Sequence, residues 1–95
     1  MMNEIKKIEK DGNICAIYEI NGYRVNYSKL DWGITMSINS IDRQSYLPEI
    51  YFDENKFRIQ TTSYGALESS EIDKVIEGYK TAQETVEELK KFFKI

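Results

Sequence analysis

Residues 68–94 read ESSEIDKVIEGYKTAQETVEELKKFFK, and apolar side chains recur along them at alternating steps of three and four residues. Such spacing places one apolar stripe on an amphipathic helix, which at 1.5 Å per residue is about 38 Å long. One stripe has one buried face, so the sequence predicts a single long C-terminal helix lying on another element. The stripe comprises Ile72, Val75, Tyr79, Ala82, Val86, Leu89 and Phe93.

Two capping patterns compete at the start of this helix. Leu67 and Ile72 have the spacing of a hydrophobic staple around a cap at position 68, whereas Ser70 with Asp73 offers a capping box. Further along, Gly78 costs about 1 kcal/mol relative to alanine in a helix interior. We expect a continuous helix in which Gly78 allows either close approach to a sheet or a bend.

Upstream of the helix, apolar and polar side chains alternate with a period of two, which predicts strands. Asp11-Gly12 and Asn21-Gly22 tolerate the positive φ angles of two-residue hairpin turns, so each should join two strands. After a loop at Asp31-Trp32-Gly33 the alternation resumes. It is most regular over residues 14–20, 23–28 and 34–38.

The following part of the chain is less regular. Alternation is lost between Asn39 and Leu47, and Pro48 cannot donate to a central strand ladder, so a loop is expected there. A short strand over 49–52, a turn over 53–55 and a longer strand over 56–63 follow, the last with Phe57, Ile59 and Thr61 facing inward. Residues 4–9 fit either an edge strand or a helical turn.

These elements predict an α+β fold, with an antiparallel β-meander of about four to six strands covered on one face by the helix. A chain of 95 residues is long enough to bury one core without disulfides or metal. We therefore expect a single domain over residues 1–95, with the sheet in 1–66 and the helix in 68–94.

Composition excludes several classes of function. A net charge of −3 argues against nucleic-acid binding through bulk charge and is too small to indicate a DNA mimic. The single cysteine, Cys15, cannot form an internal disulfide, and the apolar stretches are too short to span a membrane. A cytoplasmic protein without membrane contact is the expectation, and nucleic acid is an unlikely partner.

Catalysis is not expected either, because the chain has no histidine and so lacks the commonest general base and transition-metal ligand. No glycine-rich phosphate loop is present, and we predict no enzyme activity, cofactor or metal. Asp31, Asp42, Asp53 and Glu54 could pair for acid–base chemistry or hold a hard cation, but their positions in turns favour solvated charges.

Two surfaces are candidates for association. If the helix is longer than the strands, its C-terminal residues Leu89, Phe92, Phe93 and Ile95 project beyond the sheet, and a homodimer through that end is expected. The outward sheet face is predicted to be flat and polar, with two arginines and no carboxylate, which fits a solvated face or a binding surface. Its residues are Arg24, Asn26, Ser28, Thr35, Ser37, Asn39, Arg58, Gln60 and Thr62.

Aromatic residues and arginines at strand ends are the stronger candidates for partner binding. Tyrosine, tryptophan and arginine dominate the energetics of protein interfaces, since each buries a large area and keeps a polar group. The alternative is packing over the rim of a small core. The candidate partner-binding residues are Trp32, Arg43, Tyr46, Tyr51, Arg58 and Tyr64.

The run from Phe57 to Gly65, FRIQTTSYG, followed by the amphipathic helix, resembles small accessory proteins of phages and mobile elements of low-GC bacteria. This class includes inhibitors of host defence such as anti-CRISPR proteins, which act by occupying a partner's surface. The resemblance implies a non-enzymatic protein-binding accessory module, for example an inhibitor of a host defence nuclease. The alternatives are a structural or self-assembling protein of a phage or mobile element and a small-ligand binding domain.

Overall fold

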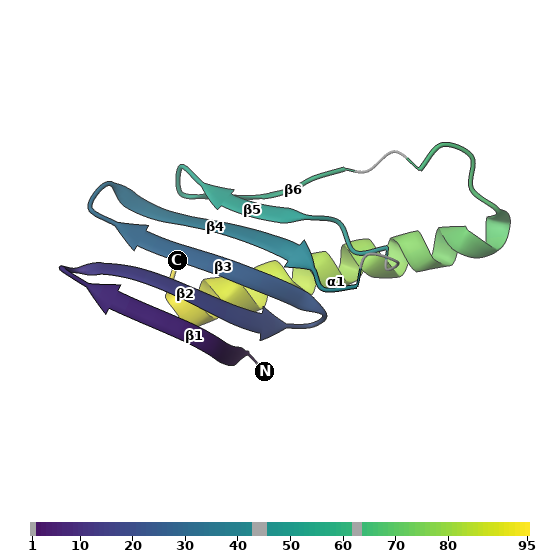
Figure 1. The fold of residues 1–95 in the computed structure, drawn as a ribbon. Coiled ribbons are helices and arrows are strands. Elements are labelled where there is room, and N and C mark those ends of the chain that lie inside the picture. Colours follow the sequence, from purple (N-terminus) through teal and green to yellow (C-terminus); the bar gives the residue numbers. More distant parts are fainter. Residues whose placement is uncertain (1, 43–45, 62–63) are drawn as a thin grey trace.

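The computed structural model describes residues 2–42, 46–61 and 64–95. Six strands form one antiparallel sheet in which each strand lies beside its neighbours in the chain, and one helix, α1 (Ser69–Phe93), lies against one face (Figure 1). The predicted α+β meander with one C-terminal helix is therefore confirmed. The strands are β1 (Asn3–Lys10), β2 (Asn13–Ile20), β3 (Tyr23–Leu30), β4 (Gly33–Ser40), β5 (Ile50–Asp53) and β6 (Lys56–Ile59).

The turns explain why the strands pair in chain order. Asp11 and Gly12 have φ angles of 54° and 83°, and Asn21 and Gly22 have 51° and 82°. Two residues with positive φ are what a type I′ hairpin turn needs, and its twist matches that of the flanking strands. The hairpins predicted at these two dipeptides are confirmed.

Two strands differ from the sequence prediction. Residues 4–9 belong to an edge strand, β1, so the helical alternative is wrong. The strand predicted over 56–63 is too long, because β5 offers only four residues for pairing and the last pair joins Ile50 to Ile59. Thr61 was predicted to face inward and is instead exposed, while Thr62 lies outside the described residues.

The core lies between α1 and one face of β2 to β5. Register places inward residues opposite one another across the sheet, as in the row that joins Tyr18, Val25, Ile38 and Ile50. The one buried polar side chain among the described residues is Thr85. Its hydroxyl donates to the Thr81 carbonyl oxygen (2.7 Å) and accepts from Asn21 Nδ2 (3.1 Å). The buried apolar residues are Ala16, Tyr18, Ile20, Tyr23, Val25, Tyr27, Met36, Ile38, Ile50, Phe52, Ala82, Val86 and Leu89.

Strand β1 contributes none of its side chains to this core, since all eight of its residues are exposed. A register shift between Glu4 and Lys6 gives the reason. Beyond it, Lys7 pairs with Ala16 and points to the helix side, while Ile8 pairs with Cys15 and points to the outer face. The sheet therefore ends in a charged edge, which discourages pairing with other chains.

The ends of α1 lie within one residue of the predicted 68–94. Glu68 is the N-cap, with an extended backbone and no side-chain capping bond, so the cap falls at position 68 and the capping box at Ser70 is not used. At the other end Lys94 adopts a left-handed conformation (φ 59°) and its backbone N–H bonds to the carbonyl oxygen of Lys90.

The helix projects past the sheet at its N-terminal half, which the sequence did not predict. Its buried residues begin only at Gly78, and the N-terminal half of the helix extends past the ends of the strands (Figure 1). The expected projection of the C-terminal end is wrong for Leu89, which is fully buried, and for Phe93, whose ring stacks on Tyr27 at 4.4 Å. The chain turns back into α1 beyond the end of the sheet, so the excess length falls at the helix start.

Candidate functional site

The structure separates the predicted partner-binding residues into three places. Trp32 lies in the turn between β3 and β4 and is 69% exposed. Tyr51 and Arg58 pair across β5 and β6. Tyr46 and Tyr64 lie together near α1, with ring centroids 5.6 Å apart. The remaining candidate, Arg43, lies outside the described residues. These positions do not form one patch.

On the outer sheet face, the polar side chains are largely occupied by one another. The Tyr51 hydroxyl bonds to the Glu49 carboxylate, which raises the pKa of Tyr51 above its usual value, and it also contacts Gln60 Oε1 at 3.0 Å. Arg24 contacts Glu19 at 3.2 Å on the same face. The expectation of a face without carboxylates is therefore wrong, and internal pairing fits a solvated surface.

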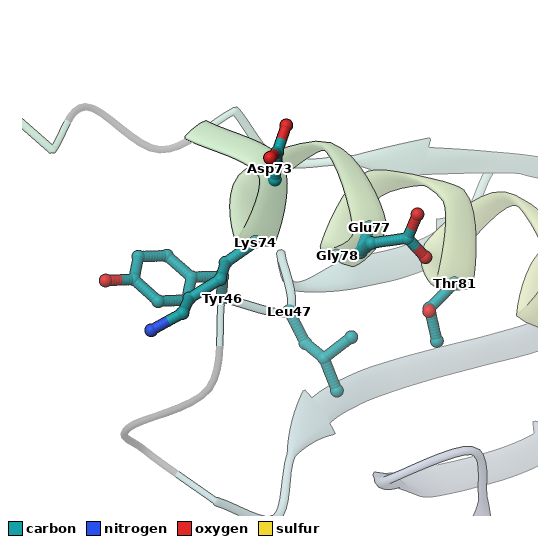
Figure 2. A pocket seen from close by; sticks show the side chains of 7 residues that line it. All are labelled: Tyr46, Leu47, Asp73, Lys74, Glu77, Gly78 and Thr81. Carbon is teal, nitrogen blue, oxygen red and sulfur yellow. The ribbon is translucent and has the colours of Figure 1, made fainter. Parts of the chain in front are cut away.

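Another candidate site lies beside the helix, where the chain between β4 and β5 crosses α1. This helix groove has a cavity volume of about 410 Å³ and is open to solvent. Figure 2 shows its lining side chains, which come from the loop before β5 and from one flank of α1. They are Tyr46, Leu47, Asp73, Lys74, Glu77, Gly78 and Thr81.

Gly78 makes this close crossing possible. A Cβ at this position would collide with the carbonyl oxygen of Tyr46 and stand 2.9 Å from its carbonyl carbon. Carbon atoms in contact are normally about 3.5–4.0 Å apart, so any larger residue would push the loop away from the helix. The close approach that the glycine predicted is thus real, but the partner is the loop and not a strand.

Hydrogen bonding holds Tyr46 over the groove. Its hydroxyl donates to Glu71 Oε2 at 2.8 Å, and this hydrogen bond, with some desolvation and the charge of Glu71, raises the pKa of Tyr46. The ring also contacts Tyr64, as noted above. Both contacts fix the orientation of an aromatic side chain that is only partly buried.

The base and the rim of the groove differ in chemistry. Leu47 and Gly78 give the groove an apolar base, and the Tyr46 ring lies at one end of it (Figure 2). Asp73 and Glu77 are separated by one helical turn and bring two carboxylates to one edge, where Glu77 contacts Lys80 at 3.7 Å. Such a site can accept a long side chain and pair with a positive charge at its end.

Sequence reasoning found Tyr46 but missed Leu47, Glu71 and Asp73 as its neighbours. Gly78 was the one indication of this site in the sequence, since a glycine inside a helix often marks a position where another segment approaches the helix closely. What approaches it depends on the path of a loop more than thirty residues upstream, which no local pattern encodes.

Within the parts of the chain that the structure describes, no group of three or more histidine, cysteine, aspartate or glutamate residues gathers to hold a metal ion. No helix of those parts is long and apolar enough to cross a membrane. Comparison of the chain with protein-family models, with curated proteins and with solved structures yields no match.

Proposed function

We propose that this chain is a non-enzymatic protein-binding module that holds its partner in the helix groove. The observation that carries the proposal is the groove itself, a shallow, open surface with an apolar base and an acidic edge on α1. Binding sites for side chains commonly combine an apolar floor with a few placed polar groups.

Preorganisation of Tyr46 supports this assignment. Immobilising a side chain on binding costs about 0.5–1.5 kcal/mol, and Tyr46 is already held by its hydrogen bond to Glu71 and its contact with Tyr64. Tyrosine is also among the residues that most often act as energetic anchors of interfaces. A partner therefore meets an ordered aromatic surface.

The charges of the groove point to the chemistry of the partner residue. Asp73 and Glu77 on one edge favour a basic group, and the Tyr46 ring can contact its aliphatic stem or a guanidinium plane. An arginine side chain of the partner fits both requirements. Lys74 on the groove wall then favours an acidic or polar neighbour next to that arginine.

The biological class that we propose follows from the resemblance of the sequence to accessory proteins of phages and mobile elements. An inhibitor acts by occupying its target's surface and needs no catalytic group, so a groove without catalytic chemistry suffices for it. A host protein such as a defence nuclease is the kind of target that this class implies. Cys15, an exposed free thiol, favours action in the reducing cytoplasm.

Charge reversal at the groove tests the proposal. The protein carrying a photo-crosslinking amino acid at Lys74 should capture one stoichiometric partner in extracts of its host, and Glu77→Lys should weaken that capture at least tenfold. Glu84→Lys is the matched control, because Glu84 is exposed on the same helix flank but does not line the groove. Equal capture by all three proteins would refute the site.

A further inference from the structure

A second hollow lies on the other flank of α1, between the C-terminal half of the helix and the β5–β6 hairpin. Its volume is about 590 Å³, against about 410 Å³ for the helix groove, and the two share no lining residue. At about 100° per residue, Val86 lies about 80° around the helix from Gly78 in one direction, and Glu77 of the groove about 100° in the other. We name this site the hairpin hollow, and its lining residues include Phe52, Lys56, Phe57, Val86, Lys90 and Ile95.

The hairpin hollow exists because one helix is too narrow to cover six strands. Strands lie about 4.8 Å apart, so this sheet is about 24 Å wide, whereas a helix with its side chains is about 10–12 Å wide. The inner side of each edge strand is therefore left beside α1. On β1 that side carries the charge of Lys7, whereas on β6 it carries Phe57 and Ile59, which are only partly buried.

The walls of the hollow are apolar. From the hairpin, the Phe57 ring packs on the Phe52 ring with centroids 4.7 Å apart, and from the helix comes the side chain of Val86. Ile95 also lines the hollow and is 43% exposed, and its backbone N–H bonds to the carbonyl oxygen of Lys90 at 3.0 Å. A hollow of this volume with aromatic and aliphatic walls is typical of sites for small apolar ligands.

The charges beside these walls are positive. Two lysines line the hollow, and within the described residues no carboxylate does. Lys90 Nζ lies 3.5 Å from Glu87 Oε1, so its charge is partly compensated. Lys56 forms no ion pair with any residue that the structure describes. Lys56 is therefore the cation that an acidic ligand could reach.

We propose that the hairpin hollow binds a free medium-chain fatty acid, with the aliphatic tail between Phe57 and Val86 and the carboxylate at Lys56. Charge complementarity selects an anionic head group. An unbranched tail has the rotatable bonds to follow walls made of tilted rings and methyl groups. It also brings no polar group that apolar walls would leave without a hydrogen bond.

This inference goes beyond the proposed function, because the hairpin hollow and the helix groove lie on opposite flanks of α1. A bound tail would cover the inner side of β6 and contact both the hairpin and the helix. Since the unfolded chain has no such hollow, the ligand should also raise the melting temperature as its concentration increases.

Isothermal titration calorimetry with sodium decanoate, kept below its micelle concentration, tests the site. We expect a dissociation constant between about 10 and 500 µM. Each buried methylene contributes up to about fourfold in affinity, so octanoate should bind at least about threefold more weakly than decanoate, and hexanoate more weakly again. Decyltrimethylammonium has the same tail with a positive head and should bind at least tenfold more weakly. Absence of decanoate binding up to about 1 mM, or equal binding of the cation, would overturn the proposal.

Substitutions locate the bound acid. Lys56→Gln should weaken decanoate binding at least about threefold, and Ile95→Asp, which adds a carboxylate to the hollow, at least about tenfold, both with unchanged circular dichroism spectra. Lys91→Gln is the matched control, because it removes the same charge at an exposed helix residue that does not line the hollow. Equal weakening by Lys91→Gln and Lys56→Gln would overturn the site.

A variant of the helix groove separates the two proposals. Glu77→Lys should leave decanoate affinity within about twofold of wild type, although it should weaken capture of the protein partner. A larger change in decanoate affinity would place the acid in the helix groove and overturn the hairpin hollow as its site. Loss of fatty-acid binding and loss of partner capture are thus distinct outcomes.

Discussion

Replacing Gly78 by alanine should destabilise this protein, although the same change stabilises most helices. In an open helix alanine gains about 1 kcal/mol over glycine. Here the new Cβ would collide with the Tyr46 carbonyl oxygen and lie 2.9 Å from its carbonyl carbon, about 0.6 Å closer than normal contact. Forcing extra atoms into a packed site costs about 1–3 kcal/mol.

The loop must move to relieve this overlap, and its movement also strains the hydrogen bond between Tyr46 and Glu71. We therefore expect a net loss of about 1–2 kcal/mol in the free energy of unfolding. For a domain of this size that loss lowers the melting temperature by roughly 5–15 °C. It is a sizeable part of a total stability of about 5–15 kcal/mol.

Urea unfolding followed by circular dichroism at 222 nm measures the effect. Gln83→Ala is the control, because Gln83 is an exposed residue of the same helix and its replacement should change stability by less than about 0.5 kcal/mol. If Gly78→Ala is as stable as wild type or more so, the loop does not lie against the helix at this position, and the reasoning about the groove fails with it.

Three further predictions concern the core, its tyrosines and the sheet edge. Leu89→Asp places a carboxylate at a fully buried position and should abolish the folded circular dichroism spectrum. Phe92→Asp, at a half-exposed position, should remain folded. Two folded proteins would show that the apolar stripe of α1 is not part of the core. Burial raises the pKa of Tyr23, whose hydroxyl donates to the Pro48 carbonyl oxygen at 2.6 Å. On raising the pH, the Tyr23 hydroxyl therefore loses its proton in the unfolded state before it does so in the folded state. The free energy of unfolding should fall as the pH rises above about 10. Tyr23→Phe should make this fall shallower by about 1.4 kcal/mol per pH unit, and an unchanged slope in urea titrations at several pH values would contradict it. Amide hydrogens of β1 should exchange at least about tenfold faster than those of β3, because β1 pairs on one side only and contributes no side chain to the core. Hydrogen exchange measured by mass spectrometry tests this expectation. Equal protection of the two strands would argue that another surface holds β1.

Local patterns predicted most of the fold because the meander is built from local contacts. The Asp11-Gly12 and Asn21-Gly22 dipeptides determine two hairpins by their own backbone preferences, and strict alternation indicates which side of each strand faces the helix. The helix boundaries followed from the apolar stripe in the same way. Within that stripe Ala82, Val86 and Leu89 are buried as predicted, whereas Ile72 is half exposed.

What the sequence did not predict depends on relations between distant elements. The length of β6 is limited by the four residues of β5, and the position of α1 under the sheet depends on where the chain after β6 turns back. Tyr46 and Tyr64 are eighteen residues apart and meet only through those paths. By contrast, Tyr51 and Arg58 belong to consecutive strands that pair with each other, and they are neighbours on the outer face of the sheet.

The chain order of the sheet has a consequence for synthesis of the protein. Every strand pairs with the strand that precedes it, so the whole sheet can assemble as the chain leaves the ribosome, without waiting for later residues. The helix comes last, and until residues 69–93 have emerged the apolar face around Val25 and Ile38 has nothing to cover it. The interval between the last strand and the last turn of the helix is therefore when the nascent chain is most exposed to aggregation.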